Sequence, residues 1–175
     1  MDLIERTANR LAITIKKANP ERTSSVEVMK FSLMILLNAL ATIVLTMAVG
    51  LVTGKFWDTM LVLFSFAILR FFSGGIHLRS SDVCVVVSTA VLSIIPHLPL
   101  EKYTLVLTII SLILTLLFAP SNIEERLRVG HSKKLLLKLI ASAIVASNFF
   151  WNSDVLAVCF IAQCTLILPY TKIRR

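Results

Sequence analysis

Long apolar segments separated by short polar stretches dominate the chain. Residues 31–53 contain no charged side chain, and at about 1.5 Å per helical residue they are long enough to cross a hydrocarbon core of about 30 Å. Five shorter apolar segments follow, and we predict each to be a further membrane helix: 56–72, 83–100, 103–119, 135–151 and 155–169. The pattern therefore predicts an all-α, polytopic membrane helix bundle of about six transmembrane helices.

Two of these predicted spans leave a second interpretation open. The segment 56–72 carries Asp58 and Arg70 near its two ends, and the segment 155–169 falls below the usual minimum of about 17 residues. Either segment could therefore be a re-entrant or strongly tilted helix.

The segment before the first span has an amphipathic pattern. Apolar residues recur there at roughly helical spacing, and basic residues lie between them. The apolar residues are Leu3, Ile4, Leu11 and Ile15, and the basic ones are Arg6, Arg10, Lys16 and Lys17. Pro20 should end this helix, and Ser25 with Glu27 is typical of the start of the next one. We predict that residues 1–30 form a cytoplasmic segment with an amphipathic helix at the membrane interface.

Composition supports a membrane protein. Of the 175 residues, 57% are hydrophobic and 16% are charged, whereas soluble domains have about 45–50% and about 25%. The mean hydropathy of +0.85 excludes a disordered chain. We expect one integral membrane domain over residues 1–175, without a second soluble domain. We expect no cleavable signal peptide, because the first 30 residues are basic and lack an apolar run.

The basic charge indicates an orientation in the membrane. A net charge of +8 would suggest a nucleic-acid partner in a soluble protein, but spanning helices distribute their charges over two sides. With six spans and a cytoplasmic amino terminus, every Lys and Arg except Lys55 and Lys102 lies on the cytoplasmic side, as the positive-inside rule requires. We therefore predict a multi-pass cell-membrane protein with both termini in the cytoplasm and no nucleic-acid partner.

The candidate site is the most polar stretch between the first and fourth spans, residues 70–84. It contains His77 and Cys84, which are seven residues apart and would lie about 10–11 Å apart on one straight helix. Direct contact therefore requires a bend. The Gly-Gly pair at 74–75 supplies flexibility, and the Ser-Ser-Asp sequence at 80–82 is a typical helix start.

Cys84 would then lie in the first turn of a helix, where unpaired backbone amides and the helix dipole stabilise a thiolate. Arg79 and a protonated His77 would add positive charge beside it. A thiolate next to an imidazole can attack a carbonyl carbon, and the imidazole then returns the proton to the leaving amine. The alternative is structural, because a cysteine at the start of a membrane helix often only packs and a loop histidine is often only solvated.

The remaining Cys and His residues give weaker signals. Cys159 and Cys164 share one predicted span without metal-ligand spacing, so we expect them to pack in the core. His97 and His131 lie between predicted spans, and we expect them to be solvated. No metal or cofactor motif is present, and we expect neither.

Two polar side chains lie inside predicted spans. Asn38 in the first span and Gln163 in the sixth need hydrogen-bond partners there. We expect both to bond to neighbouring helices; the alternative is that one of them, or Asp82, orients His77.

The candidate site matches a known pattern. Its residues are Arg70-x3-Gly74-Gly75-x-His77-x6-Cys84. Between the second and third spans of a six-span protein of this size, this pattern resembles the accessory gene regulator B (AgrB) family of bacterial membrane cysteine endopeptidases. Ala119-Pro120 at the end of the fourth span is also similar to that family.

The resemblance implies a specific activity. The family removes the carboxy-terminal part of a small quorum-sensing propeptide (AgrD-like), keeps the amino-terminal part as an acyl-thioester, and promotes closure of a thiolactone or lactone ring. Cys84 would be the nucleophile and His77 the general acid/base, at the cytoplasmic face of a bacterial cell membrane. Gly75 would shape the loop, and Arg70 would anchor the loop or bind a substrate carboxylate.

Basic residues of the predicted cytoplasmic loops suit an acidic substrate tail: they are Arg126, Arg128, Lys133 and Lys134. The expected partners are the propeptide and the lipid bilayer, and a homodimer is allowed for. Two alternatives stay open. One is a small membrane transporter or export component with Arg70, Asn38 and Gln163 lining a path; the other is a noncatalytic membrane scaffold.

Overall fold

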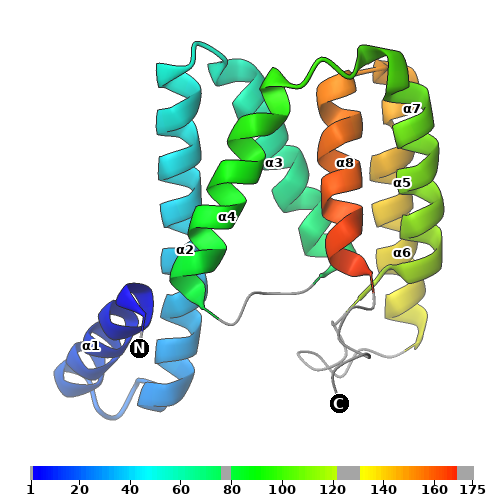
Figure 1. The fold of residues 1–175 in the computed structure, drawn as a ribbon. Coiled ribbons are helices and arrows are strands. Elements are labelled where there is room, and N and C mark those ends of the chain that lie inside the picture. The colour runs from blue at the N-terminus through cyan, green and yellow to red at the C-terminus, as the bar shows by residue number, and fades with distance from the viewer. Residues whose placement is uncertain (1, 76–79, 122–130, 169–175) are drawn as a thin grey trace.

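The computed structural model describes residues 2–75, 80–121 and 131–168, which form a bundle of helices (Figure 1). The helices are α1 (Leu3–Ala18), α2 (Val26–Val52), α3 (Phe56–Ser73), α4 (Ser81–Ile94), η1 (Ile95–His97), η2 (Glu101–Tyr103), α5 (Thr104–Phe118), α6 (His131–Ala146), α7 (Asn148–Trp151) and α8 (Asp154–Ile167). Within the described ranges, one isolated bridge between Gly74 and Ser121 is the only β-type pairing. The predicted all-α membrane bundle is confirmed.

Three helices begin with a serine cap. The hydroxyls of Ser25, Ser80 and Ser153 each accept a hydrogen bond from the amide three residues later, at the starts of α2, α4 and α8. A serine at this position satisfies one of the amides that a helix start leaves unpaired. The helix starts that we predicted at Ser25 and Ser80 are therefore present.

The longer helices α2, α3, α4, α5, α6 and α8 alternate in direction between two ends of the bundle (Figure 1). Among the described residues, four helices are long and apolar enough to cross a membrane: Val26–Val52, Phe56–Ser73, Glu101–Phe118 and Lys133–Trp151. The second predicted span is thus long enough, whereas the third and the sixth form the shorter apolar helices Ser81–His97 and Asp154–Ile167. The third shortens because α4 gives way to a 3-10 turn at Pro96. The count of six spans stays a prediction.

α8 occupies the centre of the bundle. It packs against α3 and α5, and most of its side chains are buried. Phe66 and Leu69 of α3 and Phe160 of α8 belong to the main apolar cluster. The outer helices expose large apolar side chains along their length, such as Leu36 on α2, as lipid-facing helices do.

α2 and α3 approach each other closely at Gly50. A Cβ at that position would lie 2.9 Å from the Thr59 side chain. Gly54, four residues later, has a φ of 71° in the turn that leads to α3, a conformation that favours glycine. The small residues at 50 and 54 therefore serve packing and turning within one chain.

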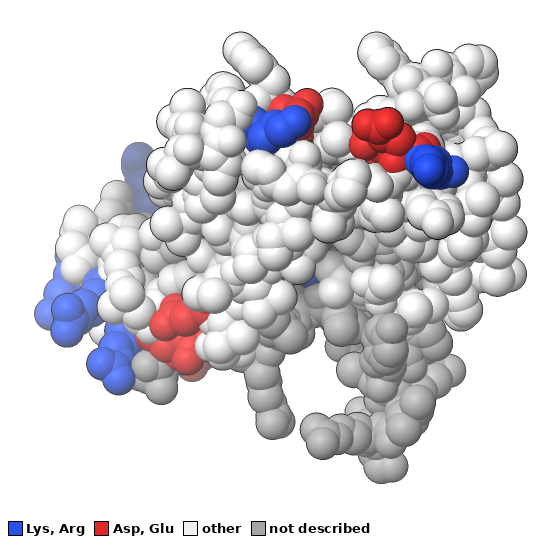
Figure 2. Space-filling view, turned by 45° about the horizontal axis from the view of Figure 1, so that its top comes forward, with Lys and Arg blue, Asp and Glu red and all other residues white. Residues whose placement is uncertain are grey.

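Charged side chains gather at the two ends of the helices (Figure 2). One end holds Lys55, Lys102 and the exposed aromatic side chains of Trp57, Tyr103 and Trp151. The opposite end holds α1 and the beginnings of α4 and α6 (Figure 1). Lys55 and Lys102 thus lie at the same end of the bundle, as the distribution of basic residues along the sequence predicts.

α1 lies beside the half of α2 that is nearer to its beginning (Figure 1). Ala8 and Ala12 are fully buried against the bundle, whereas Leu11 and Ile15 are exposed. The Glu5 carboxylate pairs with the Lys30 ammonium of α2 at 2.7 Å. A helix is present where the sequence predicts one, and its place at a membrane interface stays a prediction.

Candidate functional site

Cys84 lies in the first turn of α4. Its side chain is half-buried and forms no disulfide. Cys159 and Cys164 are fully buried in α8, where their thiols lie 3.5 Å from the Val62 carbonyl and 3.4 Å from the Ser111 carbonyl. Core packing of these two is therefore observed, and Cys84 is the most accessible of the three thiols.

The backbone amides around Cys84 have hydrogen-bond acceptors. Ser81 N donates to the Asp2 carboxylate at 2.8 Å, and Val83 N donates to the Ser80 hydroxyl at 3.3 Å. Cys84 N donates to the Ser80 carbonyl at 3.0 Å. The sequence led us to expect unpaired amides here. These three amides are paired because the Ser80 cap and a carboxylate from another helix fill the helix start.

Asp82, also in the first turn of α4, caps α1. Its two carboxylate oxygens accept hydrogen bonds from Leu3 N at 2.7 Å and from Ile4 N at 3.1 Å. On the other side of this contact, a hydrogen bond from the Ser80 hydroxyl lowers the pKa of Asp2. The start of α1 and the start of the Cys84 helix are thus held together by two acids.

Gln163 of α8 joins helix ends that are distant in sequence. Its Nε2 donates to the Ser73 hydroxyl at 3.0 Å and to the Gly74 carbonyl at 2.8 Å. Its Oε1 accepts from Arg70 Nη1 at 3.3 Å, and its side chain is fully buried. The expected interhelical hydrogen bonds of Gln163 are present, and their partners are the first residues of the candidate site.

Gly75 completes the turn that leaves α3. Its φ is 136°, and its amide donates to the Ser121 carbonyl at 3.2 Å. A Cβ here would lie 3.3 Å from the Leu166 carbonyl oxygen and 3.4 Å from Arg70 Nη1. Only glycine combines this backbone conformation with such close neighbours.

Ser73 and Ser121 belong to the same junction, although no motif singled them out. Ser121 N donates to the Ser73 carbonyl at 2.9 Å, so the chain after α5 runs alongside the end of α3. A cis peptide bond joins Ala119 to Pro120 just before it. The Ala119-Pro120 pair was the one sequence signal for this part of the junction.

Arg70 has a second described contact. Its guanidinium lies 5.8 Å from the centre of the Phe66 ring, within the range of a cation–π interaction. Together with the Gln163 bond, this contact is compatible with the predicted anchoring role, and the choice between anchoring and substrate binding stays a prediction. Arg70 and Gln163 bond to each other, so these contacts give no support to a transport path lined by both and by Asn38.

Several predicted site residues lie outside the described residues: His77, Arg79, Arg126 and Arg128. Lys133 and Lys134 lie in the first turn of α6, at the end of the bundle that also holds α1 (Figure 1). In the part of the chain that the structure describes, no three His, Cys, Asp or Glu side chains are grouped as metal ligands.

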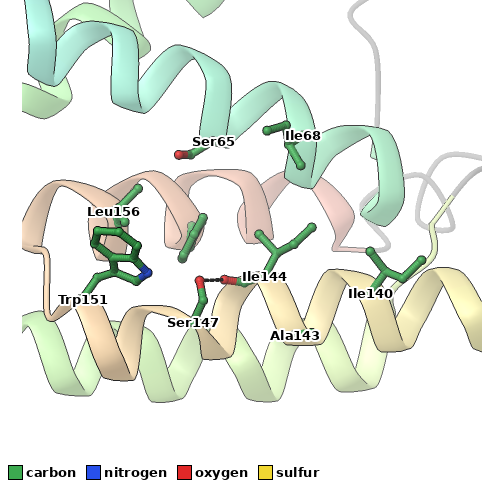
Figure 3. Close-up of a pocket in the computed structure, with 9 residues that line it drawn as sticks. Ser65, Ile68, Ile140, Ala143, Ile144, Ser147, Trp151 and Leu156 are labelled. Carbon is green, nitrogen blue, oxygen red and sulfur yellow. Dashed lines mark hydrogen bonds between the residues drawn. The ribbon is translucent and has the colours of Figure 1, made fainter.

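An open apolar groove of about 490 Å³ lies between α3, α6 and α8 (Figure 3). Apolar side chains such as Ile68, Ile140 and Leu156 line it, and the Ser147 hydroxyl in its wall donates to the Ile144 carbonyl at 2.7 Å. Among the described residues that line this groove, none is a predicted site residue.

The sequence of the chain matches a known protein family. The family described as Accessory gene regulator B (AgrB) matches residues 6–170. A putative AgrB-like protein of Halalkalibacterium halodurans is 38% identical over 97 residues, which are 55% of this chain and 49% of the relative. The aligned part thus spans about half the length of that relative. No solved structure matches the chain.

The family match runs from the first turn of α1 to beyond the end of α8 and includes the whole segment 70–84. Together with the apolar helices, it shows a membrane protein. The chain therefore belongs to the accessory gene regulator B family.

Proposed function

We propose that the chain is a membrane cysteine endopeptidase that cleaves a small precursor peptide and promotes cyclisation of its amino-terminal part. The observation that carries the proposal is the position of Cys84. It lies in the first turn of α4 and is half-buried, whereas the other two thiols are buried in α8. Membership of the AgrB family supports the same assignment.

Described residues on both sides of His77 in the sequence have defined backbone or capping contacts. Gly75 is fixed by its bond to Ser121, and Ser80 is fixed as the cap of α4. His77 lies three residues before Ser80, so covalent geometry limits the separation of their Cα atoms to about 11 Å. We propose that His77 acts on Cys84 from this position.

The proposed first step forms an acyl-enzyme. Cys84 gives its proton to His77, and its sulfur attacks the carbonyl carbon of the scissile peptide bond. The C–N bond breaks, and the protonated His77 gives the proton to the leaving amine. The carboxy-terminal fragment leaves, and the amino-terminal part of the precursor stays on Cys84 as a thioester.

The proposed second step releases the product as a ring. A thiol or hydroxyl within the bound peptide gives its proton to His77 and attacks the thioester carbonyl. The C–S bond to Cys84 breaks, and the sulfur takes the proton back from His77. Because one acyl bond replaces another without water, the product is a thiolactone or a lactone.

The proposed setting is the cytoplasmic face of a bacterial cell membrane. We propose six spans with both termini inside, so that Cys84 faces the compartment in which precursor peptides are made. Lys133 and Lys134, at the same end of the bundle (Figure 1), would attract an acidic peptide tail, and Arg126 and Arg128 would add to that charge.

The test replaces the two proposed catalytic residues in the full chain. Cys84→Ala and His77→Ala should each abolish cleavage of a co-expressed precursor peptide, measured by mass spectrometry, while the amount of protein in the membrane stays normal. His97→Ala is the matched control, because His97 is exposed in η1 at the opposite end of α4, and it should cleave normally. Normal cleavage by the Cys84→Ala protein would contradict the proposal.

A further inference from the structure

The starts of α1 and α4 each donate hydrogen bonds to a carboxylate from the other helix, in addition to the Ser80 cap that α4 has of its own. Asp2 occupies the N-cap position of α1 but makes no side-chain bond to its own helix. Its carboxylate accepts instead from Ser81 N in the first turn of α4, at 2.8 Å. Asp82 of α4 in turn accepts from Leu3 N and Ile4 N of α1. We call this arrangement the crossed cap.

The crossed cap differs from ordinary capping in what it connects. A local N-cap residue satisfies amides of its own helix and affects no other element. Here the first amides of each helix depend on a carboxylate from the other, across a separation of 79 residues. The start of α4 therefore keeps its full set of bonds only while α1 is docked.

We propose that Asp2 is a positioning residue for Cys84, and that α1 is thereby a structural part of the candidate site. The inference rests on the proposed role of Cys84 as the nucleophile. Ser81 and Cys84 are three residues apart, about 4.5 Å along the helix axis. A cap on Ser81 N therefore fixes the turn that carries the thiol, and its loss frees that turn first.

The chain offers internal controls for this proposal. Cys159 and Cys164 are fully buried in α8, so they become reactive only when the bundle as a whole loosens. Glu5 provides a control on α1 itself, because it pairs with Lys30 of α2 and makes no described bond to α4. Glu5→Gln weakens the docking of α1 on α2 and leaves the crossed cap in place.

The first experiment measures how fast iodoacetamide alkylates each cysteine of the full-length protein at neutral pH, by mass spectrometry. Asp2→Ala should alkylate Cys84 about fivefold faster, the change expected from the loss of one capping interaction. Asp2→Asn should stay close to the unmodified protein, because its amide oxygen can accept from the same N–H. Glu5→Gln should also stay close to it, and Cys159 and Cys164 should not change in any variant.

A second measurement follows the same turn without chemical labelling. Hydrogen exchange of the peptide that contains residues 81–84 should speed up in Asp2→Ala and not in Asp2→Asn. An unchanged Cys84 alkylation rate in Asp2→Ala, equal rates in the Ala and Asn variants, or faster alkylation of all three cysteines would overturn the proposal.

Precursor cleavage separates this inference from the function on which it rests. Asp2→Ala should slow cleavage, and Asp2→Asn should restore it. Normal cleavage by Cys84→Ala would remove the nucleophile from the mechanism but would leave the alkylation result standing. An unchanged alkylation rate in Asp2→Ala would remove the positioning role and would leave the cysteine mechanism intact.

Discussion

At the scale of single residues, the most informative side chain is a neutral amide inside the bundle. Gln163 bonds to Ser73, Gly74 and Arg70 at once, and all three belong to the end of α3 or the turn after it. A buried amide is costly unless its donors and acceptor are paired. Gln163 therefore holds the turn before the proposed catalytic histidine in one position.

Gln163→Leu should lower both stability and cleavage. The substitution leaves the Gly74 carbonyl and the Ser73 hydroxyl without their buried donor, which costs about 1–3 kcal/mol. We expect a reduced temperature of unfolding in detergent and slower precursor cleavage. Thr165→Val is the matched control: Thr165 is exposed two residues further along α8, and its hydroxyl bonds to a carbonyl of its own helix. Equal behaviour of the two variants would contradict a specific role for Gln163.

Some residue-scale features were predictable and others were not. Gln163 could be selected because an amide in an apolar span needs partners, and Cys84 because it follows a Ser-Ser-Asp helix start. The identity of the partners was not predictable. Asp2 meets Ser81 across 79 residues and Ser121 meets Ser73 through backbone atoms, so neither contact leaves a pattern in the local sequence.

At the scale of elements, α1 is held to the bundle by ionised carboxylates. A hydrogen bond from Lys30 lowers the pKa of Glu5 from its ordinary 4.5, and a hydrogen bond from Ser80 lowers that of Asp2 from 3.8. A lowered pKa in the docked state means that docking favours the ionised form. These carboxylates therefore stabilise docking above their ordinary pKa values and lose this effect as the pH falls through the lowered ones.

Acidification should release α1 before the other helices. We expect hydrogen exchange in residues 3–18, corrected for the intrinsic effect of pH, to speed up below about pH 4, the range in which carboxylates take up protons. The peptides of α3 and α8 in the same sample are the control, because apolar side chains hold these helices together. Constant protection of α1 down to pH 2, or its loss between pH 7 and pH 5, would contradict this mechanism.

The predicted helix boundaries agree with the structure where a local signal, such as a serine cap, sets the boundary. The serine caps placed the beginnings of α2 and α4, and apolar length predicted the bodies of α2, α3, α5 and α6. The end of α4 at Ile94 differed from the predicted 83–100, whereas α8 (Asp154–Ile167) is close to the predicted 155–169. A prediction from hydropathy does not distinguish apolar residues inside a helix from apolar residues just after it. Leu98 and Leu100, which follow η1, were therefore included in the predicted third span.

At the scale of the whole molecule, the charges of the two ends give a test of orientation. An amine-reactive reagent that cannot cross membranes should modify Lys55 and Lys102 on intact cells and should not modify Lys17 or Lys133. All four side chains are exposed in the structure, so burial does not explain a difference among them. After permeabilisation all four should react. Modification of Lys17 on intact cells would reverse the proposed orientation.

The central helix is short, and its length determines how deep in the bundle the junction around Gln163 lies. α8 has 14 residues and is about 21 Å long, whereas α2 has 27 residues and is about 40 Å long. At the end that holds α1, α2 and α6 both extend beyond the end of α8 (Figure 1). The end of α8 that carries the junction around Gln163 is therefore set back from the ends of α2 and α6, so the Gly-Gly turn that Gln163 holds lies deeper in the bundle than the ends of those two helices.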